Sequence, residues 1–590
     1  MEKILTHYKE RKSIAEQHVK MLGARINTLV VFRVLVFSIG VTLIILFFAK
    51  AWLSVLVGVT TAVLFGFLIK YHLRKKEEQR FWKEVALFYD NEIKGVNGDW
   101  SFANNGEDYH VPDHEFAYDI DLFGERSFFQ RVNRTSLNGG ERFLAKLFLS
   151  NDTSQIDSLQ EANKELREKN SLTESFVGYA RINDAEVSPE VVRSWLLSFK
   201  AFLPSYSSFL GIGFSLLSIG VLFMFSAGWI SGLYLSGWIV LGLGVIGIWL
   251  KKITKLNGEI NKVVSSIKSY GKLLYLIEAE EFRSERLSSL KSKIVHSNST
   301  ASEVIDQLSR NIDLFNNRNN LIVAMLGNGF FLWDLQTTFR LQKWLVRHAE
   351  EVVDWLDVLY ELDALLSLAI YSKNHPGFNY PVIDHNGNIY GKSLGHPLIK
   401  RAVCVTNDVD IKPASFLIIT GANMAGKSTF LRTISLAILM TNLGLPVYAD
   451  ELRIKPQKLI TSMRSSDSLL EDESYFFAEL KRLKFIIEQI DTSNYFIVLD
   501  EILKGTNSKD KEEGSKKFVR RLVEMGATGI IATHDLGLCT IEQELSQVNN
   551  YYFDAEIIND ELHFDYRMKN GVCKNMNASF LLRKMNIVSD

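Results

Sequence analysis

Cysteine is scarce in this chain of 590 residues, and the three that occur are Cys404, Cys539 and Cys573. They are scattered, and no two of them have the C-x-x-C spacing that is typical of zinc sites and redox motifs. A disulfide framework needs paired cysteines in an oxidising compartment. We therefore expect reduced thiols in the cytosol and no structural zinc.

Net charge is also nearly absent, because 67 Lys and Arg stand against 68 Asp and Glu, which gives a formal charge of −1. Proteins that bind duplex DNA draw much of their affinity from neutralised phosphates. The totals therefore predict no general attraction to nucleic acid, although DNA held inside a locally basic ring is compatible with them. The sequence also has no internal repeat and no low-complexity segment.

Charged residues are missing altogether from residues 201–250, and Lys251 and Lys252 end this run. Globular helices of this length normally have a polar face, so a buried soluble helix pair is the weaker alternative. The run instead predicts a transmembrane hairpin with spans at about Ser207–Ser226 and Ile230–Leu250. Its glycines provide small surfaces for close helix packing.

A second apolar run covers residues 26–69, where Arg33 and Lys50 are the only charges. Because about 20 helical residues cross the hydrocarbon core of a bilayer, spans at about Thr28–Phe48 and Ala51–Ile69 fit a tight hairpin. A cleaved signal peptide is disfavoured, since the first span begins late and a second follows it directly.

Basic residues flank both hairpins on their outer sides. Residues 1–25 have six Lys and Arg against three acids, and the segment 70–76 has four more basic residues. By the positive-inside rule both ends of each hairpin lie in the cytoplasm. The sequence thus predicts a multi-pass protein of the cytoplasmic (inner) membrane, with its soluble parts in the cytoplasm.

Residues 251–370 have heptad-like apolar spacing and mixed charge, which predicts long helices. Between residues 251 and 272, six lysines stand against one acid, Glu259. Anionic lipid headgroups would attract such a face, as would DNA, and an ordinary solvated helix face has a similar composition. The sequence leaves these alternatives open.

A glycine-bounded loop follows the apolar, β-prone residues 416–419 and precedes a helical pattern. Its spacing, G-x-x-x-x-G-K-S, is that of a nucleotide-binding loop. Gly421 and Gly426 let backbone N–H groups converge on phosphate oxygens, and the helix N-terminus attracts the same charge. Lys427 would reach the β- and γ-phosphates and the Ser428 hydroxyl would hold Mg²⁺, so the loop predicts ATP and Mg²⁺ as ligands.

Two further strand-like runs favour ATP hydrolysis. Residues 495–499 lead to Asp500, which would lie near the metal, and to Glu501, which would polarise the attacking water. Residues 529–533 lead to His534, which would sense the γ-phosphate. Acids at a strand end and a lone histidine each have an ordinary structural explanation, but their order after the loop favours the catalytic one.

Together these residues resemble the MutS-type mismatch repair ATPases. The loop T-G-A-N-M-A-G-K-S-T is similar to the family's T-G-P-N-M-x-G-K-S-T, which adds Asn423 and Thr429 to the nucleotide-binding residues. The run D-E-I-L-K-G-T-N from Asp500 is similar to D-E-x-x-R-G-T-S, and A-T-H at 532–534 is found in both. Three positions depart from the family pattern: Ala422, Lys504 and Asn507.

The resemblance also implies a homodimer with composite ATP sites. The segment D-E-S-Y-F-F-A-E-L at 472–480 is similar to the part of the family in which a serine at a helix start reaches the γ-phosphate of the other subunit. Ser474 would have this role here. An ordinary N-cap serine is the alternative.

The resemblance covers about residues 117–200 and 251–590. Upstream of the loop it depends on N-R-T at 133–135 with the glycine turn after it, and on residues 156–162 and 356–369. The family's amino-terminal mismatch reader and the clamp between its lever helices have no counterpart, because the two hairpins occupy their places. DNA binding is therefore implied by the family alone, and we expect no discrimination of mismatches.

The predicted fold class is an α/β P-loop ATPase domain of the ABC and MutS type, preceded by an all-α lever and core region with two transmembrane helical hairpins. The predicted divisions are a cytoplasmic amino-terminal segment (1–25), transmembrane hairpin 1 (26–70), the first part of the core (71–200), transmembrane hairpin 2 (201–250), the lever helices with the second part of the core (251–370) and the ATPase domain (371–590).

Two functions compete on this evidence. The first is a membrane-anchored ATPase that binds DNA in repair or recombination, as the family implies. The second is an ATP-driven conformational switch that acts on the membrane or on membrane partners without DNA, which the missing reader and the neutral charge favour. A subunit of an ordinary ABC transporter is a weaker third option, because no L-S-G-G-Q precedes the acidic strand.

Overall fold

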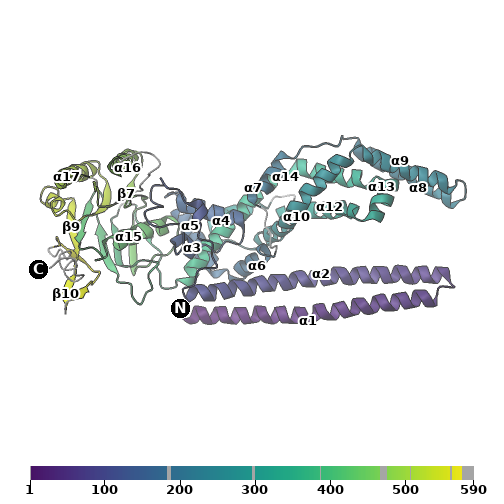
Figure 1. Cartoon of the computed structure of the whole chain (residues 1–590), viewed down its shortest axis with the longest axis horizontal. Helices are drawn as coiled ribbons and strands as arrows, with labels where there is room; N and C mark the ends of the chain where they lie inside the picture. The colour runs from purple at the N-terminus through teal and green to yellow at the C-terminus, as the bar shows by residue number, and fades with distance from the viewer. Residues whose placement is uncertain are drawn as a thin grey trace.

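The computed structural model describes residues 2–182, 188–295, 299–385, 387–464, 475–504, 506–558 and 561–573. The molecule is elongated (Figure 1). An α/β domain lies at one end, a helical body lies in the middle, and two helical hairpins point away from the α/β domain at the other end. The chain thus separates a sheet-containing end from an apolar helical end.

The first hairpin consists of α1 (Glu2–Leu46) and α2 (Ala51–Val96), joined by a tight turn. The helices approach closely at Gly40, where an added Cβ would lie 2.4 Å from the Thr61 methyl group. Both helices continue without a break past residues 25 and 70, because their charged halves remain helical and pack on the body. Large apolar side chains near the turn are exposed, such as Phe48 and Trp52.

Four buried polar groups fasten the base of this hairpin to the body. Arg134 donates to Glu92 of α2 at 2.6 Å, and the other Glu92 oxygen accepts from Asn374 at 2.6 Å. The Tyr8 hydroxyl of α1 donates to the side-chain carbonyl oxygen of Asn374 at 2.6 Å. Because an unpaired buried polar group costs free energy, this closed network fixes where both helices leave the body.

The second hairpin consists of α8 (Ser207–Ser226) and α9 (Gly232–Gly247), held together by Trp238. Its indole stacks on Phe214 with 4.8 Å between ring centroids and donates to Ser218 at 2.7 Å. The bounds of α8 are those expected from the sequence. The second helix ends earlier than the expected Leu250, because the chain bends by 66° between α9 and α10 (Leu250–Ala279).

Three helices of the described chain, α1, α2 and α8, are long and apolar enough to cross a membrane. The bent pair of α9 with the start of α10 would make a fourth span. Residues 321–332 add a short apolar element that the sequence analysis did not single out. It contains η3 (Val323–Gly327) and α13 (Asn328–Phe331), and it packs on the second hairpin where Gly329 meets Gly242.

The helical body is built around α14 (Trp333–Asn374), which runs from the second hairpin to the α/β domain (Figure 1). Asp363 of α14 accepts from the backbone N–H groups of Ser136 and Leu137 at 3.0 and 2.8 Å, and so holds the start of α4. The other short helices of the body are η1 (Glu107–Tyr109), α3 (Phe128–Val132), α4 (Asn138–Leu149), α5 (Ile156–Glu168), α6 (Asn170–Ala180), α7 (Pro189–Ser198), α11 (Glu285–Ser292), α12 (Ala301–Asn316) and η2 (Asn317–Asn319).

The α/β domain contains a six-stranded sheet of order β12-β9-β4-β8-β7-β6, parallel except for β12. Its strands are β4 (Phe416–Gly421), β6 (Lys458–Ser462), β7 (Tyr495–Asp500), β8 (Thr528–Ala532), β9 (Val548–Phe553) and β12 (Met568–Asn570). A second sheet has the order β1-β5-β2-β3, from β1 (Val382–Ile383), β2 (Ile389–Leu394), β3 (Asn407–Ile411) and β5 (Glu451–Ile454). A two-stranded ribbon, β10 (Glu556–Ile558) with β11 (Glu561–His563), completes the domain.

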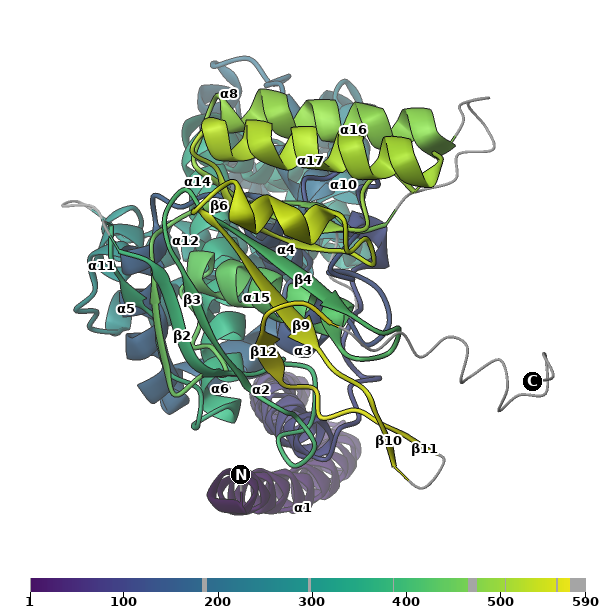
Figure 2. The same ribbon diagram turned by 90° about the vertical axis from the view of Figure 1, so that its left-hand side faces the viewer.

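Helices cover both faces of the larger sheet (Figure 2). On β4, Leu417 and Ile419 belong to the core shared with α15 (Lys427–Asn442), whereas Phe416 and Ile418 belong to the core shared with the opposite helices. These are α16 (Tyr475–Ile490) and α17 (Ser508–Glu524), followed by η4 (Leu538–Gln543). Alternate side chains of a strand point to opposite faces, so β4 is buried on both sides. The predicted α/β domain is therefore found, and it has three layers.

Candidate functional site

Three neighbouring parallel strands end at the same edge of the larger sheet. Strand β8 lies between β4 and β7, with Ile531 opposite Ile418 on one side and opposite Leu499 on the other. Ligand sites of open α/β sheets lie at the carboxyl ends of their strands. The loop after β4, the acids after β7 and the histidine after β8 are therefore brought to one place.

The loop between β4 and α15 needs its glycines. Gly421 has a φ of 150° and Gly426 a φ of 110°, which are conformations that other residues rarely adopt. At Gly421 an added Cβ would also lie 2.5 Å from the carbonyl oxygen of Phe553. Met424 has a φ of 69° at the exposed tip of the loop. The loop thus wraps tightly in front of the N-terminus of α15.

Lys427, the first residue of α15, folds back into this loop. Its Nζ donates to the carbonyl oxygens of Gly421 at 2.7 Å and Ala422 at 3.1 Å, and lies 3.1 Å from Nε2 of His534. Burial lowers the pKa of Lys427, and the carboxylates of Asp500 and Glu501 oppose that shift. An anion inside the loop would give this buried ammonium a charged partner in place of neutral carbonyls.

Ser428 and Asp500 form the second contact of the site, with the serine hydroxyl donating to Oδ2 of Asp500 at 2.8 Å. Burial raises the pKa of Asp500, as expected for a carboxyl group withdrawn from water. A hydroxyl and a carboxylate are hard oxygen ligands that suit Mg²⁺. Within the described part of the chain no cluster of three or more acidic, histidine or cysteine side chains could hold a metal alone. Substrate phosphates and water would complete the shell, as Mg²⁺ commonly requires.

Glu501 lies where the chain turns sharply after β7, with a φ of 53° and its backbone N–H donating to the carbonyl oxygen of Ala532 at 2.9 Å. Its Oε1 lies 3.1 Å from Nε2 of His534. The hydrogen bond to His534 lowers the pKa of Glu501 to about 2, with Lys504 and Lys511 adding smaller charge effects. Nε2 of His534 carries at most one proton. When this atom carries the proton it donates to Glu501, and when it carries none it accepts from Lys427.

The remaining predicted residues lie at the rim of the site or outside the described residues. Asn423 is exposed in the loop, and Thr429 is exposed in the first turn of α15. Ser474 lies outside the described residues, and α16 begins at the next position, Tyr475. The structure thus brings together the two loop glycines, Lys427, Ser428, Asp500, Glu501 and His534.

Tyr566 is a residue of this site that the sequence analysis did not find. Its ring atom Cδ1 lies 3.2 Å from the position of a Cβ on Gly426. Asn407 fixes the segment, because its amide donates to the carbonyl oxygen of Tyr566 at 3.0 Å and its carbonyl oxygen accepts from the N–H of Met568 at 2.8 Å. The ring is half-exposed beside the loop. No local pattern marks Tyr566, since a tertiary contact places it.

Glu479 of α16 is a second such residue. Its carboxylate accepts from the backbone N–H groups of Leu503 at 2.5 Å and Lys504 at 3.0 Å. Although the group is ionisable, it is largely buried, and burial raises its pKa. This contact couples the position of α16 to the segment that follows Glu501.

The helical body also contacts the edge of the α/β domain through Asp119. This buried carboxylate accepts from the Thr461 hydroxyl at 2.6 Å and from the backbone N–H groups of Met463 and Arg464 at 3.0 and 2.9 Å. Arg482 of α16 donates to the carbonyl oxygens of Glu115 and Thr461. The end of β6 and α16 are thus fastened to the segment that leads into the body.

Comparison with known proteins places this site in a family. The family model of MutS domain V matches residues 417–584. The DNA mismatch repair protein MutS of Halalkalibacterium halodurans is 32% identical over 220 residues, which are 35% of this chain and 25% of that protein. The DNA mismatch repair protein MSH6 of Arabidopsis thaliana is 30% identical over 247 residues, which are 38% of this chain and 19% of that protein.

The family model covers the carboxy-terminal part of the chain, and the MutS relatives are matched over about a quarter of their own length. The matched region contains the loop, the acids and the histidine whose geometry is described above. Residues 417–584 of this chain therefore belong to the MutS domain V family.

Proposed function

We propose that this protein is a membrane-anchored ATPase that binds ATP with Mg²⁺ and hydrolyses it to ADP and phosphate. The observation that carries the proposal is the convergence of Lys427, Ser428, Asp500, Glu501 and His534 at one edge of a parallel sheet. The described contacts link these residues in two groups, Lys427 with His534 and Glu501, and Ser428 with Asp500.

Each side chain has a separate task in this proposal. Lys427 exchanges its loop carbonyl partners for phosphate oxygens, and the backbone N–H groups of the loop hold the same anion. Ser428 and Asp500 hold Mg²⁺, which neutralises phosphate charge when bound. Glu501, ionised because its pKa is about 2, orients the attacking water as the bond breaks. His534 orients Glu501 and contacts Lys427.

The adenine base has a candidate contact in Tyr566. In the resembling family an aromatic residue just before the position of Asn407 lines the adenine pocket, whereas Cys404 and Val405 occupy that part of this chain. Tyr566 is half-exposed next to Gly426 and is held there through its backbone by Asn407. An aromatic ring stacks on any base, and each such contact contributes about 1–3 kcal/mol to the binding of nucleic acid bases.

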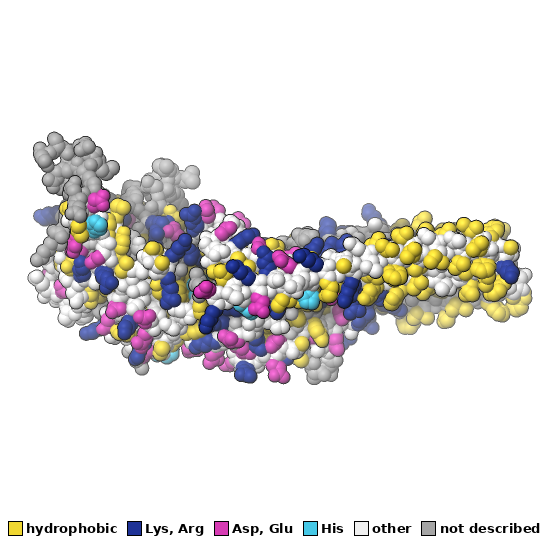
Figure 3. Space-filling view, turned by 90° about the horizontal axis from the view of Figure 1, so that it is seen from below, with side chains coloured by type: hydrophobic (Ala, Val, Ile, Leu, Met, Phe, Trp, Pro, Cys, Tyr) yellow, Lys and Arg dark blue, Asp and Glu magenta, His cyan; other side chains and the backbone are white. Residues whose placement is uncertain are grey.

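Membrane anchoring is supported by the apolar hairpins. Both point away from the α/β domain in one direction (Figure 1), and hydrophobic side chains gather over that end of the molecule (Figure 3). Soluble proteins rarely expose apolar patches of this extent. We propose that both hairpins cross the cytoplasmic membrane and leave the ATPase domain in the cytoplasm.

Thiol labelling of intact cells tests this topology. Cys539 and Cys573 are buried, so a Cys404→Ser background is suitable. A cysteine at Lys50 or Gly228, in the turns of the hairpins, should react with an impermeant reagent added outside intact cells. A cysteine at Lys76, on the basic flank, should react only after permeabilisation. Equal reaction of all three positions in intact cells would contradict the proposal.

Two tasks for the ATPase follow from different observations. The family relatives are named as DNA mismatch repair proteins, which favours DNA binding. The path of α14 from the second hairpin to the α/β domain favours a switch that acts on the membrane or on membrane partners. Stimulation of the detergent-purified ATPase by duplex DNA supports the first task, and no response supports the second. In either case we expect equal responses to matched and mismatched duplexes.

A further inference from the structure

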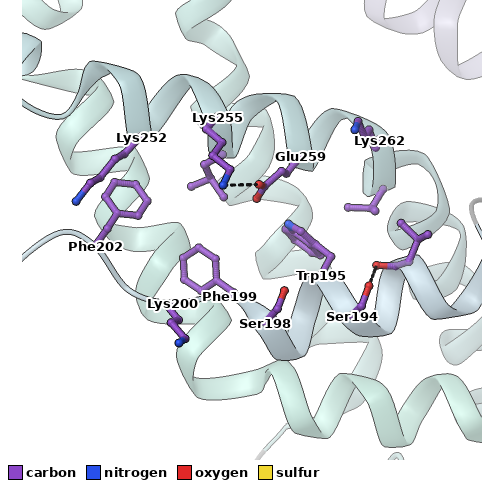
Figure 4. Close-up of a pocket in the computed structure, with 13 residues that line it drawn as sticks. Ser194, Trp195, Ser198, Phe199, Lys200, Phe202, Lys252, Lys255, Glu259 and Lys262 are labelled. Carbon is purple, nitrogen blue, oxygen red and sulfur yellow. Dashed lines mark hydrogen bonds and ion pairs between the residues drawn. The ribbon is translucent and has the colours of Figure 1, made fainter.

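A cavity opens at the base of the second hairpin, between the end of α7, the linker at 199–202 and the first half of α10 (Figure 4). Its volume is about 490 Å³. Pockets for small ligands commonly measure about 300–1,000 Å³. Because α8 begins at Ser207 and α10 at Leu250, the cavity lies beside the boundary between the apolar hairpin and the charged body.

The lining of the cavity is basic. It contains four lysines and one acid, a formal excess of three positive charges: Lys200, Lys252, Lys255, Lys262 and Glu259. One ion pair offsets part of this charge, because Lys255 lies 3.8 Å from Glu259. Lys252 lies over the ring of Phe202, 5.9 Å from its centroid. Figure 4 shows the lysines projecting from both α10 and the linker around the opening.

The cavity also has an aromatic wall with an unused hydrogen-bond donor. Trp195, Phe199 and Phe202 line it from α7 and the linker. Trp195 is 8% exposed, and among the described residues its Nε1 has no hydrogen-bond partner. A buried donor without a partner lowers the stability of the folded state. An acceptor oxygen brought by a ligand would remove this cost.

We propose that this cavity binds the headgroup of an anionic phospholipid at the cytoplasmic face of the membrane. The lysines match the phosphate, the Trp195 N–H matches a phosphate or ester oxygen, and aromatic rings suit the interface between headgroups and acyl chains. The inference depends on the proposed membrane anchoring. Duplex DNA suits the site less well, because the phosphates of a duplex lie on a convex surface and the cavity is recessed beside an apolar hairpin.

Lipid retention by the full-length protein tests this site. The protein is purified in neutral detergent and titrated with phosphatidylglycerol or phosphatidylcholine, and native mass spectrometry counts the lipids bound to each chain. For the wild type, half-saturation should need about 10-fold less phosphatidylglycerol than phosphatidylcholine. The double variant Lys252→Ala with Lys255→Ala should lose this preference.

Two further variants make the result specific. Lys251→Ala is the matched control, because Lys251 is exposed on the same helix but does not line the cavity, so the preference should change less than about twofold. Trp195→Phe keeps an aromatic ring but removes the N–H, and it should weaken retention of phosphatidylglycerol several-fold. Equal retention of both lipids by the wild type, or equal loss in Lys251→Ala and the double variant, would overturn the proposal.

Other sources of phosphate are separated by competition. Glycerol phosphate without lipid, or a duplex oligonucleotide, that displaces phosphatidylglycerol at comparable concentration would overturn the assignment to a lipid. Flotation with vesicles of phosphatidylcholine alone tests anchoring independently. Protein that floats with them but shows no preference for the anionic lipid contradicts this inference alone. Protein that does not float with these vesicles contradicts the membrane anchoring as well.

Discussion

Lys427 and Glu501 act at different stages of the proposed reaction, so their substitutions should have different effects. Lys427→Ala removes a buried contact to phosphate in the ground state, and affinity for ATP should fall about 100-fold or more. Glu501→Gln removes a group that acts on water only as the bond breaks, so binding should persist while turnover falls about 100-fold to 10,000-fold. Binding of a fluorescent ATP analogue and steady-state phosphate release measure the two effects. Unchanged affinity in Lys427→Ala would contradict the site.

The position of Tyr566 predicts that its ring contacts the adenine base. This contact can be tested separately from the contacts with the phosphates. Tyr566→Ala should weaken ATP binding about 5-fold to 100-fold, because base stacking contributes about 1–3 kcal/mol. Tyr566→Phe keeps the ring beside Gly426 and should bind like the wild type. Inorganic triphosphate, measured as a competitor, should be unaffected by either change. An equal loss for ATP and triphosphate would mean that Tyr566 acts through the loop.

The contact between Glu501 and His534 predicts that the stability of the protein depends on pH. The folded-state pKa of Glu501, about 2, lies below its ordinary 4.5, so its contribution to stability is complete above about pH 4.5 and is lost as the pH falls towards 2. His534→Gln weakens this contribution. The wild type should therefore have the higher thermal midpoint at pH 5, and the difference should shrink as the pH falls towards 2. A difference that stays constant over this range would contradict the assigned pair.

The sequence alone could indicate the site residues that belong to short motifs directly after a strand. The loop, the acid pair and the histidine each follow a strand directly, so their spacing carries the signal. Tyr566 and Glu479 reach the site by tertiary packing, and their neighbours in sequence give no pattern for it. Ser474 stays a prediction, because it lies outside the described residues.

At the scale of elements, Asp119 joins the helical body to the α/β domain. Asp119→Asn places an amide N–H₂ opposite at least one of its three donors, which should cost about 1–3 kcal/mol. Asp121→Asn is the matched control, because Asp121 pairs with exposed Arg464 and should cost less than about 1 kcal/mol. Urea unfolding of the detergent-purified protein measures both. Equal costs for the two variants would mean that the buried contact contributes no more than the exposed one.

Composition predicted the helices of the hairpins better than it predicted their ends. The bounds of α8 agree with the expected span because turn-forming residues lie just outside it, Pro204 before it and Gly228 after it. The bend of 66° after α9 begins within an uninterrupted apolar run, so hydropathy does not record it. Residues 321–332 were missed because they are shorter than the roughly 20 residues of a span. The predicted boundaries at 25 and 70 fall inside continuous helices.

At the scale of the whole molecule, the proposed cycle needs a route between the ATP site and the membrane. The segment after Glu501 is held by Glu479 of α16, and α16 is fastened to the body through Arg482. From the body, α14 leads to the second hairpin. Each joint is a described contact, so a change at Glu501 has a continuous mechanical path to the hairpins.

The proposed dimer also concerns the whole molecule, because Ser474 of each chain completes the ATP site of the other. Ser474 precedes α16, and the start of a helix favours an anion, whereas the loop at Gly421 already supplies a cradle for phosphate within the chain. Lys427→Ala and Ser474→Ala should each be nearly inactive alone. In a heterodimer of the two, both lesions fall in one composite site and the other stays intact. An equal mixture should therefore recover about a quarter of the wild-type turnover, since half of the dimers formed at random are heterodimers with one working site. Mixtures with confirmed subunit exchange and no recovery would contradict the shared site and leave Ser474 as an ordinary helix cap.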